Sequence, residues 1–312
     1  MITERITDPT DAIDAQQIET AFATGHGVTI QFSHDCYTPE QLREIDQLCQ
    51  QHGSKIEVRF FAHDIEPFDA SILSALPNVK WLTLGAMEEV RGIDTIARLP
   101  KLEQLSIDIS ALNDPAFIDS LPLEQLTRLS VAGNQKRNFD LATLARAQNL
   151  QDLFIQGHTK NIEIIGDLPN LASLGLSSMP NRQSLDFVNK IQGLKSLLLI
   201  IGGRTSIDDV QNETLEELRI IRVRGLDSLG DLARFHALRK LQVEDQLQLK
   251  ALSLDGVDLH ELTVLNCKNL AEITGLEDQR NLQLFRVGRT GLDLDGLANL
   301  SWPETITQLD LN

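Results

Sequence analysis

Residues 150–155 are LQDLFI, residues 171–176 are LASLGL and residues 194–199 are LKSLLL. Each segment has apolar residues at its first, fourth and sixth positions, with variable residues between them. Eleven copies of this pattern follow one another, with starts 21 to 24 residues apart. Such regular self-similarity indicates a repeat protein whose stacked units share one core. The copies start at Val79, Leu102, Leu126, Leu150, Leu171, Leu194, Leu215, Leu238, Leu259, Leu282 and Ile306.

The alternation inside each copy predicts a short β-strand. Side chains alternate between the two faces of a strand, so the leucines enter the core and the residues between them face solvent. Further apolar residues, such as Ile93, Ile96 and Leu99, predict short helical or irregular segments behind the sheet. The triplet Leu249-Leu252-Leu254 falls between two copies, so we place it on the same outer side. Residues 63–312 are therefore predicted to form an α/β solenoid with a parallel sheet.

The spacing resembles the leucine-rich repeat family, whose consensus is L-x-x-L-x-L-x-x-N/C-x-L, and the bacterial, cytosolic proteins of that family in particular. Asn134 and Cys267 occupy the N/C position in two copies, whereas residues of other types occupy it elsewhere. The resemblance implies a solenoid with its sheet on the concave side and about eleven repeats. It also implies a buried structural role for Cys267.

Residues 1–62 do not follow the repeat and are predicted to form an α/β cap over its first unit. A helix is expected from Asp11 to Thr24 and a strand from Val28 to Phe32. Thr38-Pro39-Glu40-Gln41 has the form of a capping box with proline at the first helical position. A second helix should follow, with Cys49 in its apolar stripe, and then a strand from Ile56 to Phe61 that joins the sheet.

Charge and composition exclude several kinds of partner. The chain has 312 residues and a net charge of −17, which disfavours nucleic acid and anionic membranes because both require basic groups. No apolar stretch has the ~18 residues that a membrane helix requires. The three cysteines suggest no disulfide framework, and the N-terminal residues have no secretory pattern. We therefore expect a cytoplasmic protein.

Residues that could support catalysis are few. His34-Asp35-Cys36 is the most suggestive cluster, but neighbouring residues on an extended chain point apart. Gly202-Gly203-Arg204 could hold an anion, although a glycine turn after a strand is commoner. The histidines show no metal-ligand spacing. We predict no enzyme activity, no catalytic residue, no metal and no cofactor.

Protein binding on the concave face is the function that the repeat favours. Positions two, four and six after each repeat start should face this surface, and most hold small or polar residues. Large apolar residues beside arginines are typical of interface hot spots. The candidate contact residues are Trp81, Phe154, Leu198, Ile200, Arg219, Ile221, Arg222 and Arg286.

Three kinds of protein partner are compatible with such a face. An adaptor would bind other cytosolic proteins, an inhibitor would neutralise a basic toxin or nuclease, and a host-directed effector would bind host proteins. The acidic net charge would steer a basic partner towards the chain. The final copy, which includes Leu309 and Leu311, has no polar cap behind it. We expect Trp302 and Pro303 to close that end, or two chains to form a homodimer through it.

Overall fold

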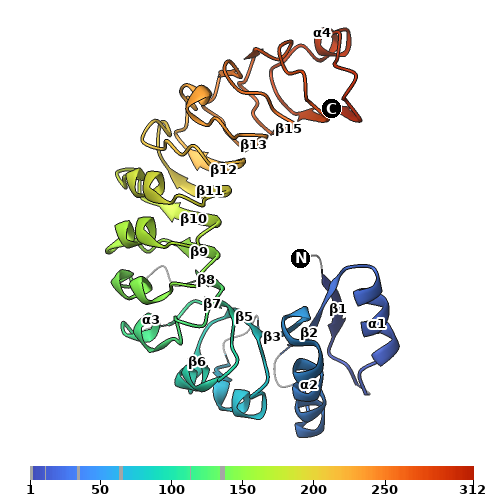
Figure 1. The fold of residues 1–312 in the computed structure, drawn as a ribbon, viewed down its shortest axis with the longest axis vertical. Coiled ribbons are helices and arrows are strands. Elements are labelled where there is room, and N and C mark those ends of the chain that lie inside the picture. The colour runs from blue at the N-terminus through green and yellow to red at the C-terminus, as the bar shows by residue number, and fades with distance from the viewer. Residues whose placement is uncertain (1–2, 11, 34–35, 63–65, 113, 134–137) are drawn as a thin grey trace. The chain divides into compact units, whose positions relative to one another are not determined.

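The computed structural model describes residues 3–10, 12–33, 36–62, 66–112, 114–133 and 138–312. It divides into two compact units, Met1–Lys160 and Asn161–Asn312, which are drawn in Figure 1. Each unit is a stack of parallel strands with short helices on one side of the sheet.

Among the described residues, the main sheet of unit 1 has seven parallel strands that follow the order of the chain. Strand β3 pairs with β5, and Val58 is the partner of Leu82 in that register. The N-terminal strands and the first repeats therefore form one continuous sheet, as predicted for the segment from Ile56 to Phe61, whereas a capping role for residues 1–62 stays a prediction. The strands are β1 Thr3–Thr7, β2 Gly27–Ser33, β3 Ile56–Phe61, β5 Trp81–Met87, β7 Gln104–Ile109, β8 Arg128–Ala132 and β9 Asp152–Gln156.

The two cap helices are α1, Ala15–Ala23, and α2, Pro39–His52, and they pack against β2 and β3. Helix α1 begins later than predicted because the Asp14 carboxylate accepts the backbone N–H groups of residues 16 and 17 and caps it there. The predicted capping box of α2 is confirmed by reciprocal hydrogen bonds between Thr38 and Gln41. Strand β1 was not predicted, because its residues TERIT carry one aliphatic side chain only.

The outer side of unit 1 holds short elements, as the further apolar residues between the repeat strands predicted. They are the 3-10 helices η1 Gly53–Lys55, η2 Ala70–Ala75, η3 Ile93–Arg98 and η4 Ala142–Arg146, helix α3 Phe117–Ser120, and the paired strands β4 Phe68–Asp69 and β6 Val90–Arg91.

Unit 2 also contains seven parallel strands in chain order, all of them from the repeats. Equivalent repeat positions pair across it, so Leu218 is the partner of Leu197 on one side and of Leu241 on the other. The strands are β10 Ser173–Met179, β11 Ser196–Gly203, β12 Glu217–Arg224, β13 Lys240–Glu244, β15 Glu261–Leu265, β17 Leu284–Gly288 and β18 Gln308–Leu311.

The triplet at Leu249-Leu252-Leu254 lies outside that sheet, as predicted. It contributes β14, Ala251–Ser253, which pairs with β16, Glu272–Thr274. The other short elements of unit 2 are η5 Ile162–Asp167, η6 Asp186–Lys190, η7 Leu232–Arg234 and α4 Leu294–Ala298.

Strand alternation places the core as the sequence predicted. In β12, Leu218 and Ile220 are fully buried, whereas Arg219 and Ile221 between them are half-exposed. Cys267 is also buried, and its Sγ lies 3.4 Å from the Leu265 carbonyl oxygen. The thiol therefore occupies a structural position behind the sheet. Asn134, which was predicted at the N/C position, and His34 and Asp35 of the suggestive cluster lie outside the described residues.

The C-terminal end of unit 2 is partly closed by Trp302. Its ring centroid lies 5.1 Å from that of Phe285, and its Nε1–H donates to the Leu297 carbonyl oxygen at 3.2 Å. The predicted packing of Trp302 is thus confirmed. Leu309 nevertheless stays 39% exposed, although the equivalent leucines of earlier strands are buried. A homodimer through this end stays a prediction.

Candidate functional site

Each sheet has an inner face, by which we mean the face opposite the short helices. The side chains that project from this face differ between the two units. In unit 1 they form a polar row across four strands. The Thr29 hydroxyl lies 2.8 Å from the Thr3 hydroxyl and 2.6 Å from a Glu57 carboxylate oxygen. The Thr83 hydroxyl donates to the other carboxylate oxygen at 2.6 Å. These groups therefore satisfy one another across neighbouring strands.

Trp81 offers little surface to a partner, contrary to its prediction as an exposed aromatic anchor. It is only 8% exposed, and the Arg128 guanidinium lies 5.7 Å from its ring centroid. Arg128 is held there by Asp152 on the next strand, at 3.3 Å. The arginine covers the indole from two repeats further along, a contact that the spacing of single repeats does not reveal.

Phe154 is half-exposed on β9 of the same unit. It faces the way predicted, since Leu153 and Ile155 on either side of it are buried. Its partner in the β8 register is the small residue Ser130. Phe154 therefore remains available on the inner face of unit 1.

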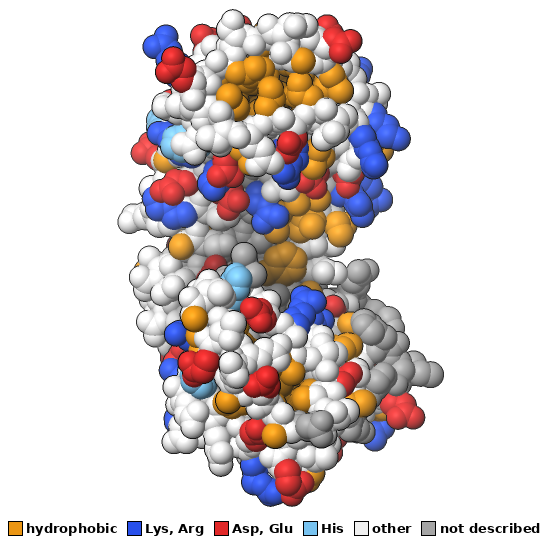
Figure 2. Space-filling model, turned by 90° about the vertical axis from the view of Figure 1, so that its right-hand side faces the viewer, with side chains coloured by type: hydrophobic (Ala, Val, Ile, Leu, Met, Phe, Trp, Pro, Cys, Tyr) orange, Lys and Arg blue, Asp and Glu red, His pale blue; other side chains and the backbone are white. Residues whose placement is uncertain are grey.

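Unit 2 carries aliphatic side chains on this face. Ile200 on β11 is the register partner of Ile221 on β12, and Leu198 lies two residues before Ile200. All three are half-exposed. Figure 2 shows hydrophobic side chains gathered on this face of the C-terminal unit beside lysine and arginine side chains. The structure thus brings together three predicted residues as one aliphatic cluster.

The predicted arginines bridge neighbouring strands. Arg219 donates through Nε to the Gln242 side-chain oxygen at 2.9 Å, and Arg222 pairs with Asp245 at 3.0 Å. Arg286 pairs with Asp310, also at 3.0 Å. Arg286 lies on β17, several strands away from the aliphatic cluster on β11 and β12. Each arginine is therefore partly committed to its neighbouring strand.

Ile201 is a candidate contact residue that the sequence did not indicate at first sight. It occupies the seventh position after its repeat start, where the chain of most repeats turns with a positive φ. Its own φ is 46°, a left-handed conformation that costs a β-branched residue about 1–2 kcal/mol. The side chain is nevertheless 46% exposed. The corresponding residues are Ala86, Gly133, Gly157, Ser178, Arg222, Asp245, Asn266 and Arg289.

A strained, exposed isoleucine suggests a functional constraint, because strain persists where selection retains it for another purpose. A signal for it was present in the sequence. Residues 197–201 are LLLII, a run that breaks the usual alternation of apolar and polar positions.

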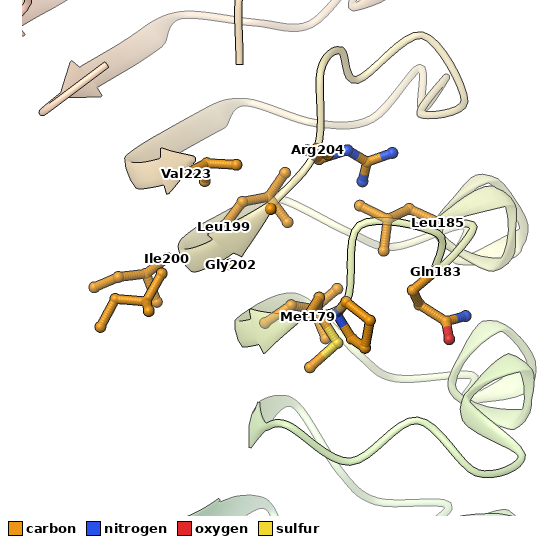
Figure 3. A pocket seen from close by; sticks show the side chains of 12 residues that line it. Met179, Gln183, Leu185, Leu199, Ile200, Gly202, Arg204 and Val223 are labelled. Atoms are coloured by element: carbon orange, nitrogen blue, oxygen red, sulfur yellow. The ribbon is translucent and has the colours of Figure 1, made fainter. Parts of the chain in front are cut away.

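An apolar hollow opens beside Ile201 at the ends of β10, β11 and β12 (Figure 3). It is small, with an accessible volume of about 20 Å³. Its lining is mostly hydrophobic and includes Met179, Pro180, Leu185, Leu199, Ile200 and Val223.

Gly202 forms part of the same wall. A Cβ at this position would lie 3.0 Å from the Met179 carbonyl oxygen, so the close approach of β10 and β11 requires glycine there. The predicted glycine turn is therefore wrong in detail, because Gly202 and Gly203 form the end of β11.

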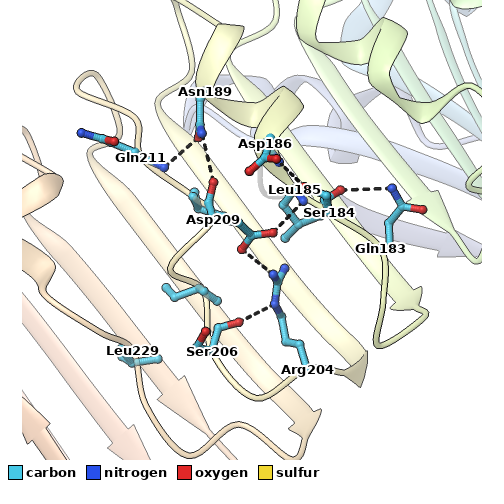
Figure 4. A network of polar contacts seen from close by, with 12 residues as sticks. Gln183, Ser184, Leu185, Asp186, Asn189, Arg204, Ser206, Asp209, Gln211 and Leu229 are labelled. Carbon is cyan, nitrogen blue, oxygen red and sulfur yellow. Dashed lines mark hydrogen bonds and ion pairs between the residues drawn. The ribbon is translucent and has the colours of Figure 1, made fainter.

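A polar network fixes one side of the hollow (Figure 4). Arg204 pairs with the Asp209 carboxylate and donates through Nε to the Ser206 carbonyl oxygen at 2.6 Å. Asp209 in turn accepts the Leu185 backbone N–H at 2.8 Å. Arg204 and Leu185 both line the hollow, so this largely buried ion pair holds two parts of its wall together.

Two of the three cysteines, Cys49 and Cys267, are unsuited to nucleophilic chemistry. Burial raises the pKa of the Cys49 thiol to about 12 and that of Cys267 to about 11, with nearby acidic side chains adding to both. Neither thiol therefore ionises appreciably near neutral pH. Cys36 is exposed, and its Sγ lies 3.9 Å from the Ser33 hydroxyl.

No protein-family model and no curated protein matches the sequence. Among solved structures, an internalin of Listeria monocytogenes aligns over 100% of this chain and 87% of its own length, with a TM-score of 0.54 and 16% identity. The chain has a leucine-rich repeat fold. A leucine-rich repeat protein of Leptospira interrogans aligns over 91% of the chain and 89% of its own length, with a TM-score of 0.46 and 14% identity.

Toll of Drosophila, solved in a complex with Spätzle, is also similar, with a TM-score of 0.44 and 16% identity. The alignment covers 99% of this leucine-rich repeat chain and 50% of the Toll chain. At 16% identity, the likeness to the internalin establishes the fold and transfers no activity.

Among the helices of the described residues, none combines the length and the apolar character needed to cross a membrane.

Proposed function

We propose that this leucine-rich repeat chain is a non-catalytic protein-binding module whose principal contact surface is the inner sheet face of unit 2. One observation carries the proposal. Leu198, Ile200 and Ile221 form a half-exposed aliphatic cluster on a face whose other positions are mostly small, polar or charged. Clustered apolar side chains at a surface mark interaction sites more reliably than scattered ones.

The surroundings of the cluster suit a protein partner. Arg219 and Arg222 lie on the same strand as Ile221 and are positioned by their neighbours on β13. Aliphatic anchors beside arginines are frequent in interface hot spots. In unit 1, we propose Phe154 as a separate contact, because it is half-exposed on the equivalent face. Arg286 would contribute at the periphery.

A second candidate is an inhibitor of a basic toxin or nuclease. The net charge of −17 supports it, because an acidic surface accelerates association with a basic protein. Both candidates place the partner on the same face. They differ in the charge of the partner and in its own activity. A cytoplasmic location stays a prediction for either candidate, as does a host-directed role.

The experiment is affinity capture followed by a binding measurement. The full chain is immobilised, captured proteins are identified by mass spectrometry, and the purified partner is titrated by calorimetry. Replacing Leu198 and Ile221 together by alanine should weaken binding about tenfold or more, because buried anchors dominate interface energies. The control is Thr263→Ala on the same face, which should change the Kd less than about twofold. Equal affinities for the double variant and the native chain would refute the proposal.

A further inference from the structure

The hollow at the ends of β10, β11 and β12 has features that the repeat architecture does not require. At the left-handed position, five other repeats place glycine, serine, aspartate or asparagine and three place alanine or arginine, but among the described residues Ile201 alone is β-branched there. Here that position holds the exposed Ile201, next to an opening lined by Met179, Leu185 and Val223. The strain keeps an aliphatic side chain at the rim of an aliphatic hollow.

The volume of the hollow limits what can enter it. Its accessible volume of about 20 Å³ is far below the ~300–1,000 Å³ of pockets that hold small-molecule ligands. The charged group in its wall, Arg204, is already paired with Asp209. The hollow therefore suits the end of one aliphatic side chain of a larger partner and not a cofactor.

Several arginines line the hollow or adjoin its lining residues in the sequence, although Asp209 pairs with Arg204 there. Strand β12 has three arginines, and the loop whose Pro180 and Gln183 line the hollow contains Arg182. Arg182 and Arg224 are exposed, and neither forms an ion pair within the described part of the chain. The backbone of Arg224 borders the hollow, since its carbonyl oxygen accepts the Arg204 N–H at 3.1 Å.

We infer that this hollow binds a short acidic-aliphatic segment of a protein partner. The end of one leucine, isoleucine or methionine side chain of that segment packs between Ile201 and Met179. A neighbouring aspartate or glutamate pairs with Arg224, and a further one with Arg182. The inference deepens the proposed function and rests on it, because it specifies the partner chemistry at one edge of the same face. It also predicts that the contact is acidic, although the net charge alone favours a basic partner.

The test uses a phage-displayed library of random dodecapeptides selected on the full chain. Peptides that contain an aliphatic residue flanked by aspartate or glutamate should be enriched. One such peptide is then synthesised with a fluorescent label, and its Kd is measured by polarisation. A matched peptide with lysine in place of its acidic residues should bind about tenfold or more weakly.

Two variants place the peptide at the hollow. Ile201→Asn removes the aliphatic rim but suits the left-handed backbone, as Asn266 does in a later repeat. It should raise the Kd of the acidic peptide about tenfold or more without lowering the thermal midpoint of the protein. An unchanged midpoint separates a lost contact from lost folding. Arg224→Glu should lower the affinity for the acidic peptide and restore binding of the lysine peptide.

The outcomes separate this inference from the proposed function. Enrichment of basic or purely polar peptides would overturn the inference, as would a selection that yields no binding peptide. Unchanged binding by Ile201→Asn or by Arg224→Glu would overturn it too. In each of these cases the proposed function still stands if the Leu198 and Ile221 double variant loses its captured partner, and fails if it does not.

Discussion

The inner faces of the two units have the same strand geometry but differ in side-chain chemistry. In unit 1, Thr29, Glu57 and Thr83 bind one another across three strands, and Arg128 covers Trp81. In unit 2, Ile200 and Ile221 are paired in register and remain half-exposed. Both faces come from the same repeat geometry. The face of unit 1 is largely satisfied within the chain, whereas the aliphatic cluster of unit 2 gains by burial against another molecule.

The comparison shows where a repeat protein places its specificity. Equivalent positions of neighbouring repeats lie side by side, so complementary residues there stabilise the chain itself. A row of residues that do not complement one another is available for a partner. In this chain the polar side chains of the inner face give way to aliphatic ones on the adjacent strands β11 and β12 of unit 2.

The largest expected effect tests whether Leu198 belongs to the face and Leu199 to the core. Leu199→Ala removes a side chain that is almost fully buried and should lower the free energy of unfolding by about 2–5 kcal/mol. Leu198→Ala should lower it by less than about 1 kcal/mol, because this side chain is half-exposed. Urea unfolding followed by circular dichroism measures both. Similar losses would mean that the face of unit 2 is part of its core.

A smaller effect tests whether the polar row of unit 1 contributes to stability. Glu57→Ala leaves Thr29 and Thr83 without their shared acceptor and should lower the free energy of unfolding by about 1.5 kcal/mol. Glu217→Ala in unit 2 is the matched control, since that carboxylate accepts from Ser196 on the next strand. It should cost roughly half as much. The reverse order, measured by the same unfolding experiment, would contradict the contrast between the faces.

The smallest expected effect concerns the reactivity of the buried thiols, of which each unit has one. At pH 8, Cys49 in unit 1 and Cys267 in unit 2 should resist a thiol reagent, because their pKa values are raised to about 12 and about 11 and both are shielded. Exposed Cys36 should react within minutes. Titration with a chromogenic disulfide should give one fast thiol in the native chain and three in denaturant. Rapid reaction of Cys267 would show that the core of unit 2 opens more readily than that of unit 1.

The sequence determined the repeat frame and the inward and outward positions of its strands. Leu153 and Ile155 are buried and Phe154 between them is half-exposed, because a strand alternates its side chains locally. The cap helix that begins at Pro39 was also predictable, since the capping box forms between residues three apart. Strand β1 could not be found in this way, because its place depends on pairing with β2 and its composition gives no signal.

Only the tertiary structure decided which outward residues are available to a partner. Trp81 is covered by Arg128, which comes from two repeats further along the chain, so its burial depends on contacts between repeats. The hollow beside Ile201 similarly forms where three strand ends and the Arg204–Asp209 pair meet. Periodicity describes each repeat separately, whereas availability depends on which residues of neighbouring repeats bind one another. The sequence therefore determined the scaffold and the residues facing outward, and packing between repeats decided the candidate surface.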